Sequence, residues 1–365
     1  MDEDPQVYSD EKIAGLRYFG IFMIIVAGLY FLFLCAMRKR IQLSIGIVKE
    51  SARAVQAMPT LLLFPIVQTV GLIIFVIVWL VYAVYVASLG DIDYNEFSSN
   101  GVTVMVRSFT YDDETREMAF FLLFCFFWTT EFISAVGSIV IARAVASWYF
   151  TRDKGTIGTL TVLNAIRQSM WYHMGTAAFG SLIIAIIQTI RAIVAYIQKK
   201  IEEVDADNAF VKCAACCCQC CFACLEKCMR FLNKHAYIQT AIFSTNFCIS
   251  AKNGFFLILR NFGRIGAISF VSEIVVVIGK VFIAVITGAS AYVLMNTYIS
   301  DEVESVVGPV VVVMILTYAV ASLFFSIFSM AVDTVLQCFI ADEEMFDGDD
   351  CYAEGSLKSW VDSYG

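Results

Sequence analysis

Charged residues are scarce in this sequence. Only 16% of its 365 residues are charged and 59% are hydrophobic, whereas a soluble domain is about a quarter charged. A water-soluble globule of this length would need polar surface that these residues do not supply. The apolar residues also lie in runs that are long enough to cross a bilayer. The composition therefore excludes a soluble globular protein and predicts a polytopic membrane protein.

Other absences narrow the functional class. The net charge is −8, and no basic stripe interleaved with aromatic residues is present, which argues against nucleic-acid binding. His173 and His235 are the only histidines, and neither lies in a His-Glu-x-x-His pattern or beside a nucleophile. The sequence contains no phosphate-binding loop and no dinucleotide-binding fingerprint. We therefore expect no enzyme activity, no cofactor and no coupling to ATP.

Six apolar segments are each long enough to span a membrane as a helix, for which about 20 apolar residues suffice. Pro59, Pro65 and Pro309 stand at the starts of such segments, where a missing N–H costs little. The expected spans are residues 15–36, 61–88, 118–147, 175–197, 266–296 and 308–339. The predicted fold class is an all-α polytopic membrane protein with additional amphipathic interfacial helices.

The charges between the spans predict the orientation, because lysine and arginine in short loops stay on the cytoplasmic side. Basic residues 38–40 follow the first span and mark the inside, whereas residues 89–117 carry seven acids and two arginines and are expected outside. Residues 1–14 form an acidic segment without a secretory signal pattern. Residues 341–365 hold eight acids and one lysine, which predicts a solvated cytosolic tail.

This alternation fails between residues 198 and 265. Six basic residues after the 175–197 span argue for the inside, although the count of crossings places them outside. One more membrane crossing would make the orientation of the last two spans agree with the charges of the loops beside them. Residues 235–262 are the only candidate for it. Lys252 lies in the middle of that segment, so we expect a seventh, discontinuous span of the kind that transporters use to build substrate sites. An interfacial helix lying on the membrane is the alternative.

Eight of the 13 cysteines fall within residues 198–234, which we expect to form a loop. Four assignments stay open: acylation on a cytosolic face, disulfides on an external face, a zinc site, or inert cysteines facing the membrane. The overlapping sulfurs define no single tetrahedral set, so we expect no metal. The eight cysteines are Cys213, Cys216, Cys217, Cys218, Cys220, Cys221, Cys224 and Cys228.

Several short motifs are distinctive. They are Phe150-Thr-Arg-Asp-Lys154, Cys224-Leu-Glu-Lys-Cys228, Asn233-Lys-His-Ala-Tyr237, Ser244-Thr-Asn-Phe-Cys-Ile-Ser-Ala-Lys-Asn253, Gly279-Lys280 and Met330-Ala-Val-Asp333. In one register over about residues 15–345, the chain resembles the choline transporter-like family of solute carriers. The resemblance implies transport of choline, and in some members ethanolamine, by proteins with cytosolic termini. Family members carry further N-terminal spans and a large extracellular loop, so the chain resembles the C-terminal part of such a protein.

Choline is a permanent cation without an ammonium proton, so a protein holds it through aromatic faces and a nearby carboxylate. Glu131 is the best candidate acid, because it lies midway along the 118–147 span, where a charge is costly. Helical spacing places Phe124 and Trp128 on the same face as Glu131. The alternative is a structural Glu131 that pairs with a base of another span, namely Arg17, Arg191 or Lys280, or that is simply protonated.

Further substrate-binding candidates lie on two other spans. Trp79 and Tyr82 share a face of the second span, where aromatic residues also serve as interfacial anchors. The broken span offers Tyr237, Thr245 and Asn246, whose side chains form hydrogen bonds at membrane depth. Thr245 or Asn246 would hold the choline hydroxyl, or alternatively would hold the break together.

Glu273 and Lys280 both lie within the 266–296 span. Seven residues separate them, so they share one face about 10 Å apart, which is too far for direct contact. Each therefore needs a partner from another helix or a water-filled path. We expect them to belong to a gating or structural charge network.

Two functional hypotheses follow. The first is a transporter that moves choline or a related amine by facilitated, potential-driven transport. The second is a membrane scaffold, or an incomplete part of a transporter, that keeps the fold without moving substrate. The expected partners are the small cation and the lipid bilayer, and the expected location is the plasma membrane, with an organelle membrane as the alternative.

Overall fold

The computed structural model describes residues 10–36, 38–99, 102–204, 209–298, 305–346, 350–355 and 357–358. These residues form ten α-helices, two 3₁₀ helices and one two-stranded sheet, which confirms the all-α class. The elements in chain order are α1 (Asp10–Ala36), α2 (Arg38–Ala57), η1 (Pro59–Leu63), α3 (Phe64–Ala87), β1 (Asp91–Ser99), β2 (Val102–Thr110), α4 (Asp113–Tyr149), η2 (Lys154–Thr156), α5 (Thr159–Tyr172), α6 (Met174–Val204), α7 (Ala209–Phe243), α8 (Phe247–Arg260), α9 (Phe262–Tyr298) and α10 (Val307–Met345).

The described helices include five that are long and apolar enough to cross a membrane. They are Pro59–Ala87, which combines η1 and α3, then α4, Met174–Ile201 within α6, α9 and α10. Residues Cys216–Phe243 of α7 pass the same test together with α8, as one broken span. In α1 the apolar stretch is shorter, Arg17–Gly28, so its crossing stays a prediction. Five or six candidate spans among the described residues confirm the polytopic membrane class.

The broken span differs in extent from the segment expected at residues 235–262. The helix break lies between Phe243 and Phe247, and the axes of α7 and α8 meet there at 109°. Ser244 enters the break with a φ of 56°, in the left-handed region. Upstream, residues 209–234 are helical rather than a loop, because neither glycine nor proline interrupts α7.

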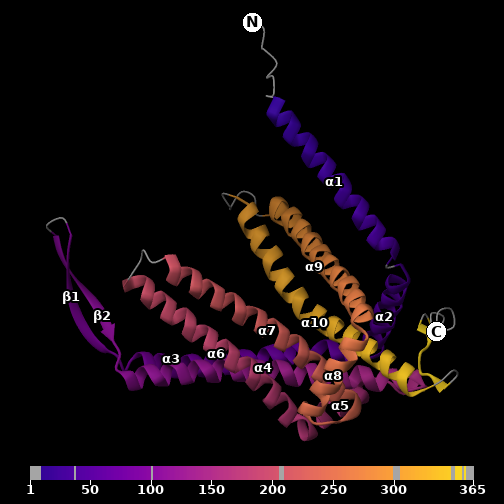
Figure 1. The fold of residues 1–365 in the computed structure, drawn as a ribbon. Coiled ribbons are helices and arrows are strands. Elements are labelled where there is room, and N and C mark those ends of the chain that lie inside the picture. Colours follow the sequence, from indigo (N-terminus) through magenta and orange to yellow (C-terminus); the bar gives the residue numbers. More distant parts are fainter. Residues whose placement is uncertain are drawn as a thin grey trace.

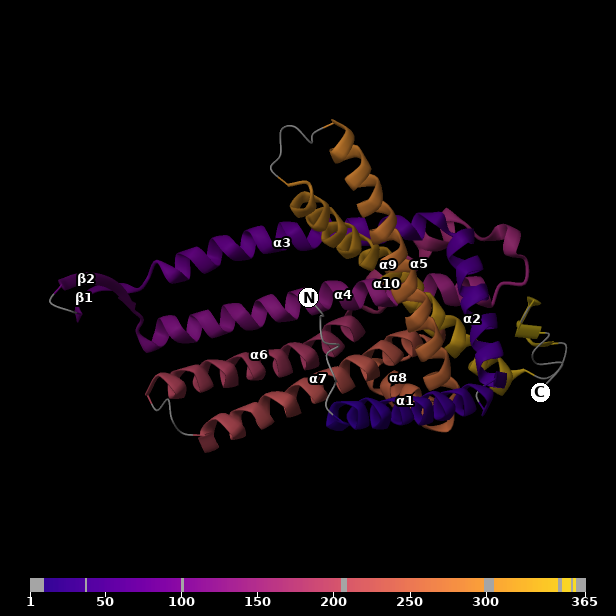
Figure 2. The ribbon, with the colours of Figure 1, turned by 90° about the horizontal axis from the view of Figure 1, so that it is seen from above.

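The long helices converge at one end of the molecule (Figure 1). There they meet α2, α5, α8 and the C-terminal segment. The β1–β2 hairpin, the end of α6 and the start of α7 lie at the opposite end (Figures 1 and 2). From the shared end, α9 and α10 diverge from the group formed by α3, α4, α6 and α7 (Figures 1 and 2). The described cysteines of α7 therefore lie toward the hairpin end.

The hydrophobic core lies at the convergent end. Leu43 and Ile47 of α2, Val145 of α4, and Leu336 and Phe339 of α10 are fully buried and belong to one cluster. The helix α2 is amphipathic, because its apolar residues recur at helical spacing and its other face carries basic residues. The core therefore joins α2 to the two diverging groups of helices at the end where they meet.

Both ends of α4 are capped, which fixes the helix that carries Glu131. Asp112 accepts a hydrogen bond from the Thr115 N–H at 3.0 Å, as an N-cap. Hydrogen bonds from Thr115 hold the pKa of the Asp112 carboxyl below its ordinary value. At the other end, the Lys154 ammonium donates to the carbonyls of Trp148 (2.8 Å), Tyr149 (3.1 Å) and Thr151 (2.6 Å). A cation there also opposes the negative end of the helix dipole.

Part of the tail expected to be solvated is packed against the convergent end. The Asp342 carboxylate accepts hydrogen bonds from the N–H groups of Tyr352 and Ala353, each at 2.9 Å. The Tyr149 hydroxyl donates to the same carboxylate at 3.0 Å, which ties the tail to α4. Leu357 is almost fully buried. The acids of this segment thus serve partly as acceptors for local donors, which the charge count alone does not show.

Candidate functional site

A polar cavity lies between α3, α4, α6, α7 and α10, where the two groups of helices begin to diverge. Its volume is about 310 Å³. Hydroxyl, amide and charged side chains within membrane-spanning helices cost free energy unless they face protein or a water-filled path. We name this space the central cavity. Its polar lining consists of Gln68, Glu131, Ser134, Ser138, Arg230, Asn233, Lys234, Tyr237, Ser326 and Ser329.

Glu131 lines the central cavity and is paired with Arg230 of α7. The guanidinium donates through Nη1 to Oε2 at 2.9 Å and through Nη2 to Oε1 at 2.7 Å, which is a bidentate ion pair. The Glu131 side chain is 12% exposed and that of Arg230 is 41% exposed. The partner is thus a base within the cysteine-rich segment, and not one of the three expected bases on other spans.

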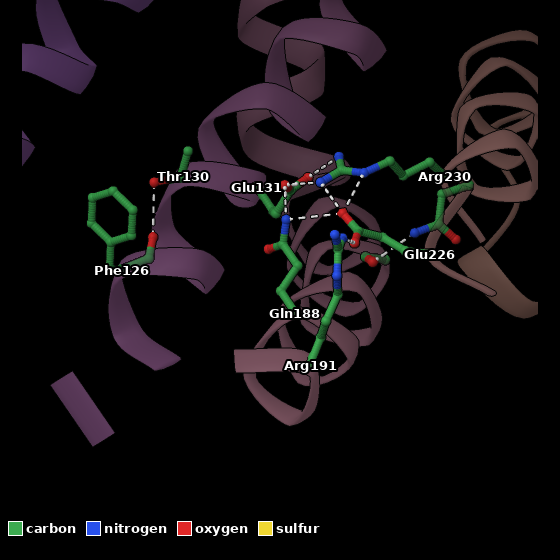
Figure 3. Close-up of polar contacts among 9 residues, drawn as sticks. Phe126, Thr130, Glu131, Gln188, Arg191, Glu226 and Arg230 are labelled. Carbon is green, nitrogen blue, oxygen red and sulfur yellow. Dashed lines mark hydrogen bonds and ion pairs between the residues drawn. The ribbon is translucent and has the colours of Figure 1, made fainter. Parts of the chain in front are cut away.

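A second acid, Glu226, shares the same guanidinium. Arg230 donates to Glu226 Oε1 through Nε at 3.1 Å and through Nη2 at 3.0 Å. Arg191 of α6 donates to the other oxygen of Glu226 at 2.8 Å. The Gln188 amide bridges the two acids, with 3.2 Å to Glu131 and 3.3 Å to Glu226 (Figure 3). Helices α4, α6 and α7 are therefore joined by one polar network.

The charges of this network balance. Two carboxylates, Glu131 and Glu226, face two guanidiniums, Arg191 and Arg230. Arg230 bonds both acids at once, so it can release one of them and still keep a charged partner. That property distinguishes this arrangement from an isolated ion pair, in which a buried charge would be left alone.

A separate ion pair closes the side of the central cavity next to α10. Lys234 of α7 is paired with Asp333 of α10 and also contacts the Ser329 hydroxyl at 3.4 Å. Asp333 is buried. One turn further along α7, the Gln239 amide donates to Gln337 of α10 at 2.9 Å. Polar side chains thus connect α7 to α10 from the central cavity toward the convergent end.

Tyr237 brings an unpaired hydroxyl to the central cavity. The residue is 5% exposed, and its buried hydroxyl oxygen has no hydrogen-bond partner among the described residues. It lies against Gly180 of α6, where an added Cβ would approach the hydroxyl to 2.3 Å. Glycine at this position therefore lets α6 and α7 pack around the phenol. A buried hydroxyl without a partner indicates a place for a ligand group or a water.

The other predicted aromatic residues, Phe124, Trp128, Trp79 and Tyr82, do not line the central cavity. The Phe124 and Trp128 rings lie 5.8 Å apart, and the Trp128 indole donates to the Ala178 carbonyl at 3.2 Å. The Trp79 indole donates to the Leu122 carbonyl at 2.9 Å, and Tyr82 is largely exposed. Trp128 lies about one turn and Phe124 about two turns from Glu131 along α4, so both lie outside the cavity lining.

Thr245 and Asn246 lie at the helix break and not in the central cavity. Asn246 caps α8 by accepting from the Ile249 N–H at 3.0 Å. The Thr245 and Ser250 hydroxyls lie 2.7 Å apart, and Ser250 also accepts from the Thr240 hydroxyl at 2.9 Å. These contacts match the alternative in which the two residues hold the break together.

Glu273 and Lys280 lie on α9, away from the central cavity. Glu273 is exposed and Lys280 is half-buried. Neither forms an ion pair with another residue that the structure describes. Their role in a charge network stays a prediction.

The cysteine-rich run lies along the first half of α7. Its cysteines from Cys216 to Cys228 are exposed, whereas the Cys213 side chain lies outside the described residues. Within the described part of the chain, no group of three histidine, cysteine, aspartate or glutamate residues is arranged to hold a metal ion. The choice between acylation, disulfides, a zinc site and inert cysteines stays open.

Arg230, Glu226 and Gln188 are the site residues that the sequence analysis missed. Arg230 and Glu226 lie in the segment that the sequence analysis assigned to a loop. Charged residues in a loop do not indicate which side chains they contact in the folded protein. One signal was present: Glu226 precedes Arg230 by four residues, the spacing of a favourable ion pair on a helix. Once the segment is helical, that pair lies on one face and reaches Glu131.

Comparisons with known proteins agree with the fold. Residues 21–344 match the family model described as plasma-membrane choline transporter. The chain is 32% identical to choline transporter-like protein 2 of Dictyostelium discoideum, over 98% of the chain and 56% of that protein. It is 34% identical to choline transporter-like protein 2 of Bos taurus and to choline transporter-like protein 5-A of Danio rerio, over 90% and 87% of the chain.

These relatives are longer proteins, and the chain covers 51% and 50% of the latter two. It thus spans about half the length of the relatives it matches. The match nevertheless includes every candidate span from α3 to α10 and all residues of the central cavity. This protein is an integral membrane protein that belongs to the choline transporter-like family.

Proposed function

We propose that this protein moves choline, or a related amine such as ethanolamine, across a membrane. The proposal depends on one observation: an acid, Glu131, lines a polar cavity between five helices in the region that matches the family. A quaternary ammonium needs a carboxylate of opposite sign and cannot be held by N–H bonds. Glu131 is the described carboxylate that borders this cavity. The names of the relatives support a transporter rather than an enzyme.

Substrate binding has to displace Arg230 from Glu131, because the network already balances its charges. We propose an exchange in which the cation takes the place of the guanidinium at Glu131 while Arg230 keeps its bonds to Glu226. The displaced group therefore never becomes an unpaired buried charge, which would cost several kcal/mol. In this scheme the Arg230 guanidinium competes with the substrate cation for Glu131 and neutralises that carboxylate when no substrate is bound.

The remaining groups of the site fit the rest of the substrate. We assign the bond to the choline hydroxyl to Tyr237, because its hydroxyl has no partner among the described residues and the residue lines the cavity. Trp128 and Phe124, about one and two turns from Glu131, would offer aromatic faces on the path from the hairpin end, each contributing about 0.5–2 kcal/mol. Thr245 and Asn246 are not part of this scheme, because they hold the helix break.

We propose facilitated transport driven by the membrane potential. A single positive charge gains about 2.3 kcal/mol per 100 mV, which corresponds to roughly fifty-fold accumulation at 1.4 kcal/mol per decade. No sodium or ATP is needed for that. Proton exchange is the competing mechanism, because an intramembrane acid such as Glu131 can carry a proton on the return step. We propose a location in the plasma membrane, in line with the description of the matching family model. We also propose a cytosolic C-terminus, which the charges at residues 38–40 and the acidic 89–117 segment favour.

The second function, a membrane scaffold without transport, is tested by the same experiment. Purified protein is reconstituted into liposomes, and uptake of radiolabelled choline is measured with a potassium diffusion potential, inside negative, at equal pH. We expect accumulation that follows the potential. Uptake that ignores the potential but follows a pH gradient would favour proton exchange. The absence of both responses in well-folded protein would favour the scaffold, or a need for further segments.

Two variants test the role of Glu131. Glu131→Gln removes the charge and is expected to lower choline uptake per folded protein at least tenfold. Glu117→Gln is the matched control, because Glu117 is an exposed acid on the same helix. Equal loss in both variants, or loss of Glu131→Gln protein from the membrane without a change in specific uptake, would assign Glu131 a structural role.

A further inference from the structure

A second pocket lies where two helix breaks face each other. One break separates α5 from α6 at His173, and the other separates α7 from α8 at Ser244–Asn246. Residues of both breaks border one space of about 500 Å³, which we name the break pocket. It shares no residue with the central cavity. None of the described residues that line it is acidic.

Two helices begin at the break pocket. Gly175 and Thr176 belong to the first turn of α6, and Phe247 and Cys248 to the first turn of α8, and all four border the pocket. The N–H groups of a first turn have no partner within their own helix, and the helix dipole makes that end positive. Asn246 caps only the Ile249 N–H of α8. The first turns of two helices, α6 with 31 residues and α8 with 14, thus border one space.

His173 is an independent sign of a ligand. It borders the pocket, is 6% exposed, and its imidazole has no hydrogen-bond partner among the residues that the structure describes. An imidazole that lines a pocket and has no protein partner is available to bond a ligand group there. Burial lowers the pKa of His173, and the positive charge of Arg143 nearby lowers it further.

Arg143 extends the positive character of the pocket. Its Nη1 donates to the Ser244 hydroxyl at 3.1 Å and to the Ala241 carbonyl at 3.1 Å, while Nε bonds Gln168. Ser244 itself borders the pocket, so the guanidinium lies one hydroxyl away from it. No carboxylate accepts from Arg143 in the described part of the chain. Its charge is therefore not cancelled locally.

The surroundings are those of a membrane interface. The end of α5 beside the pocket presents Trp171 and Tyr172, which are 78% and 79% exposed. Leu160 and Leu163 are exposed on the same short helix. Aromatic and leucine side chains on an amphipathic helix are typical of the level of lipid headgroups.

We propose that the break pocket binds a phosphate group. The free N–H groups of two helix starts, the unpaired His173 and the uncancelled Arg143 all favour an anion with several acceptor oxygens, and the pocket offers no opposing acid. The phosphate belongs either to the headgroup of an anionic phospholipid or to a soluble phosphate compound. The inference is independent of the transport of choline, because it uses no residue of the central cavity.

Gly175 offers a sharp test. An added Cβ at Gly175 meets no atom within 4 Å, so the first atom of a side chain enters open space there. Gly175→Glu places a carboxylate at the pocket, and an acid in the first turn of a helix is favourable for folding. Gly175→Gln is the matched control, because it has the same size without the charge. Both variants are expected to fold, as checked by gel filtration in detergent.

Binding is measured as the rise in melting temperature of the purified full chain. The probes are inorganic phosphate, dioctanoyl phosphatidic acid and dioctanoyl phosphatidylcholine. We expect the phosphatidic acid to stabilise the wild-type chain and Gly175→Gln, and its apparent affinity to fall at least tenfold in Gly175→Glu. Stabilisation by inorganic phosphate as well would identify a soluble source, and stabilisation by phosphatidic acid alone a lipid source. No stabilisation by inorganic phosphate or by phosphatidic acid, or equal affinities in the two Gly175 variants, would overturn the proposal.

Discussion

Replacing Glu131 and Arg230 separately and together measures how strongly α4 is tied to α7. The single changes are Glu131→Gln and Arg230→Gln, and the third protein carries both. The pair contains two hydrogen bonds between charged groups, at 2.7 and 2.9 Å, and such bonds contribute about 1.5–3 kcal/mol each when buried. Because Arg230 is 41% exposed, solvent screens part of this, and we expect a coupling energy of about 2 kcal/mol.

The two single changes should also differ from each other. After Glu131→Gln, Arg230 keeps Glu226, so the loss of stability is about 1–2 kcal/mol. After Arg230→Gln, Glu131 keeps only the Gln188 amide, and a nearly buried acid left without its base costs about 3 kcal/mol. Arg230→Gln is therefore the more damaging of the two.

The assay is the free energy of unfolding of purified protein, taken from titrations with a denaturing detergent. Glu117→Gln combined with Arg230→Gln is the control cycle, because Glu117 is exposed on α4 and far from the network; its effects should add. Additive effects in the Glu131 cycle as well, within about 0.5 kcal/mol, would show that the ion pair does not form.

Three further predictions concern the frame around the site. Leu357→Ala should lower the free energy of unfolding by about 2–3 kcal/mol, since Leu357 is 1% exposed; no change on thermal unfolding would show that the C-terminal segment is not docked. Asn246→Ala removes the cap of α8 and should cost about 1 kcal/mol, whereas Asn246→Asp, measured by the same melting experiment, should cost far less. A cysteine introduced at Ser98 should be labelled by an impermeant thiol reagent on intact cells, whereas a cysteine introduced at Ser356 should not. Equal labelling of the two would contradict the proposed orientation.

The candidate spans were predictable from the sequence because each one is a single long apolar run. Five such runs appear as helices with ends within a few residues of the expected ones, apart from α4 and α10, which extend beyond the membrane-length core. The acid Glu131 was predictable for the same reason, because a charge inside an apolar run is conspicuous. What surrounds such a residue is decided by helices that are distant in sequence.

The segment from residue 198 to 262 shows why the remainder was not predictable. Its hydropathy is low, and the charge count treated Arg230 and Lys234 as loop residues that mark the cytoplasmic side. In the structure both bases are paired with acids, Arg230 with Glu131 and Lys234 with Asp333. A paired base inside the protein carries no information about orientation, so only the contacts between helices could correct the assignment.

The convergence of the helices at one end has a mechanical consequence. Helices α9 and α10 contain 37 and 39 residues, so each is about 55 Å long at 1.5 Å per residue. Both are anchored near α2 and the C-terminal segment, while their other ends stand apart from α3, α4, α6 and α7 (Figures 1 and 2). If each helix rotates as a rigid body about its anchored end, a rotation of about 5° moves the far end by about 5 Å. A change in side-chain packing at α2 is thereby amplified at the far ends of both helices.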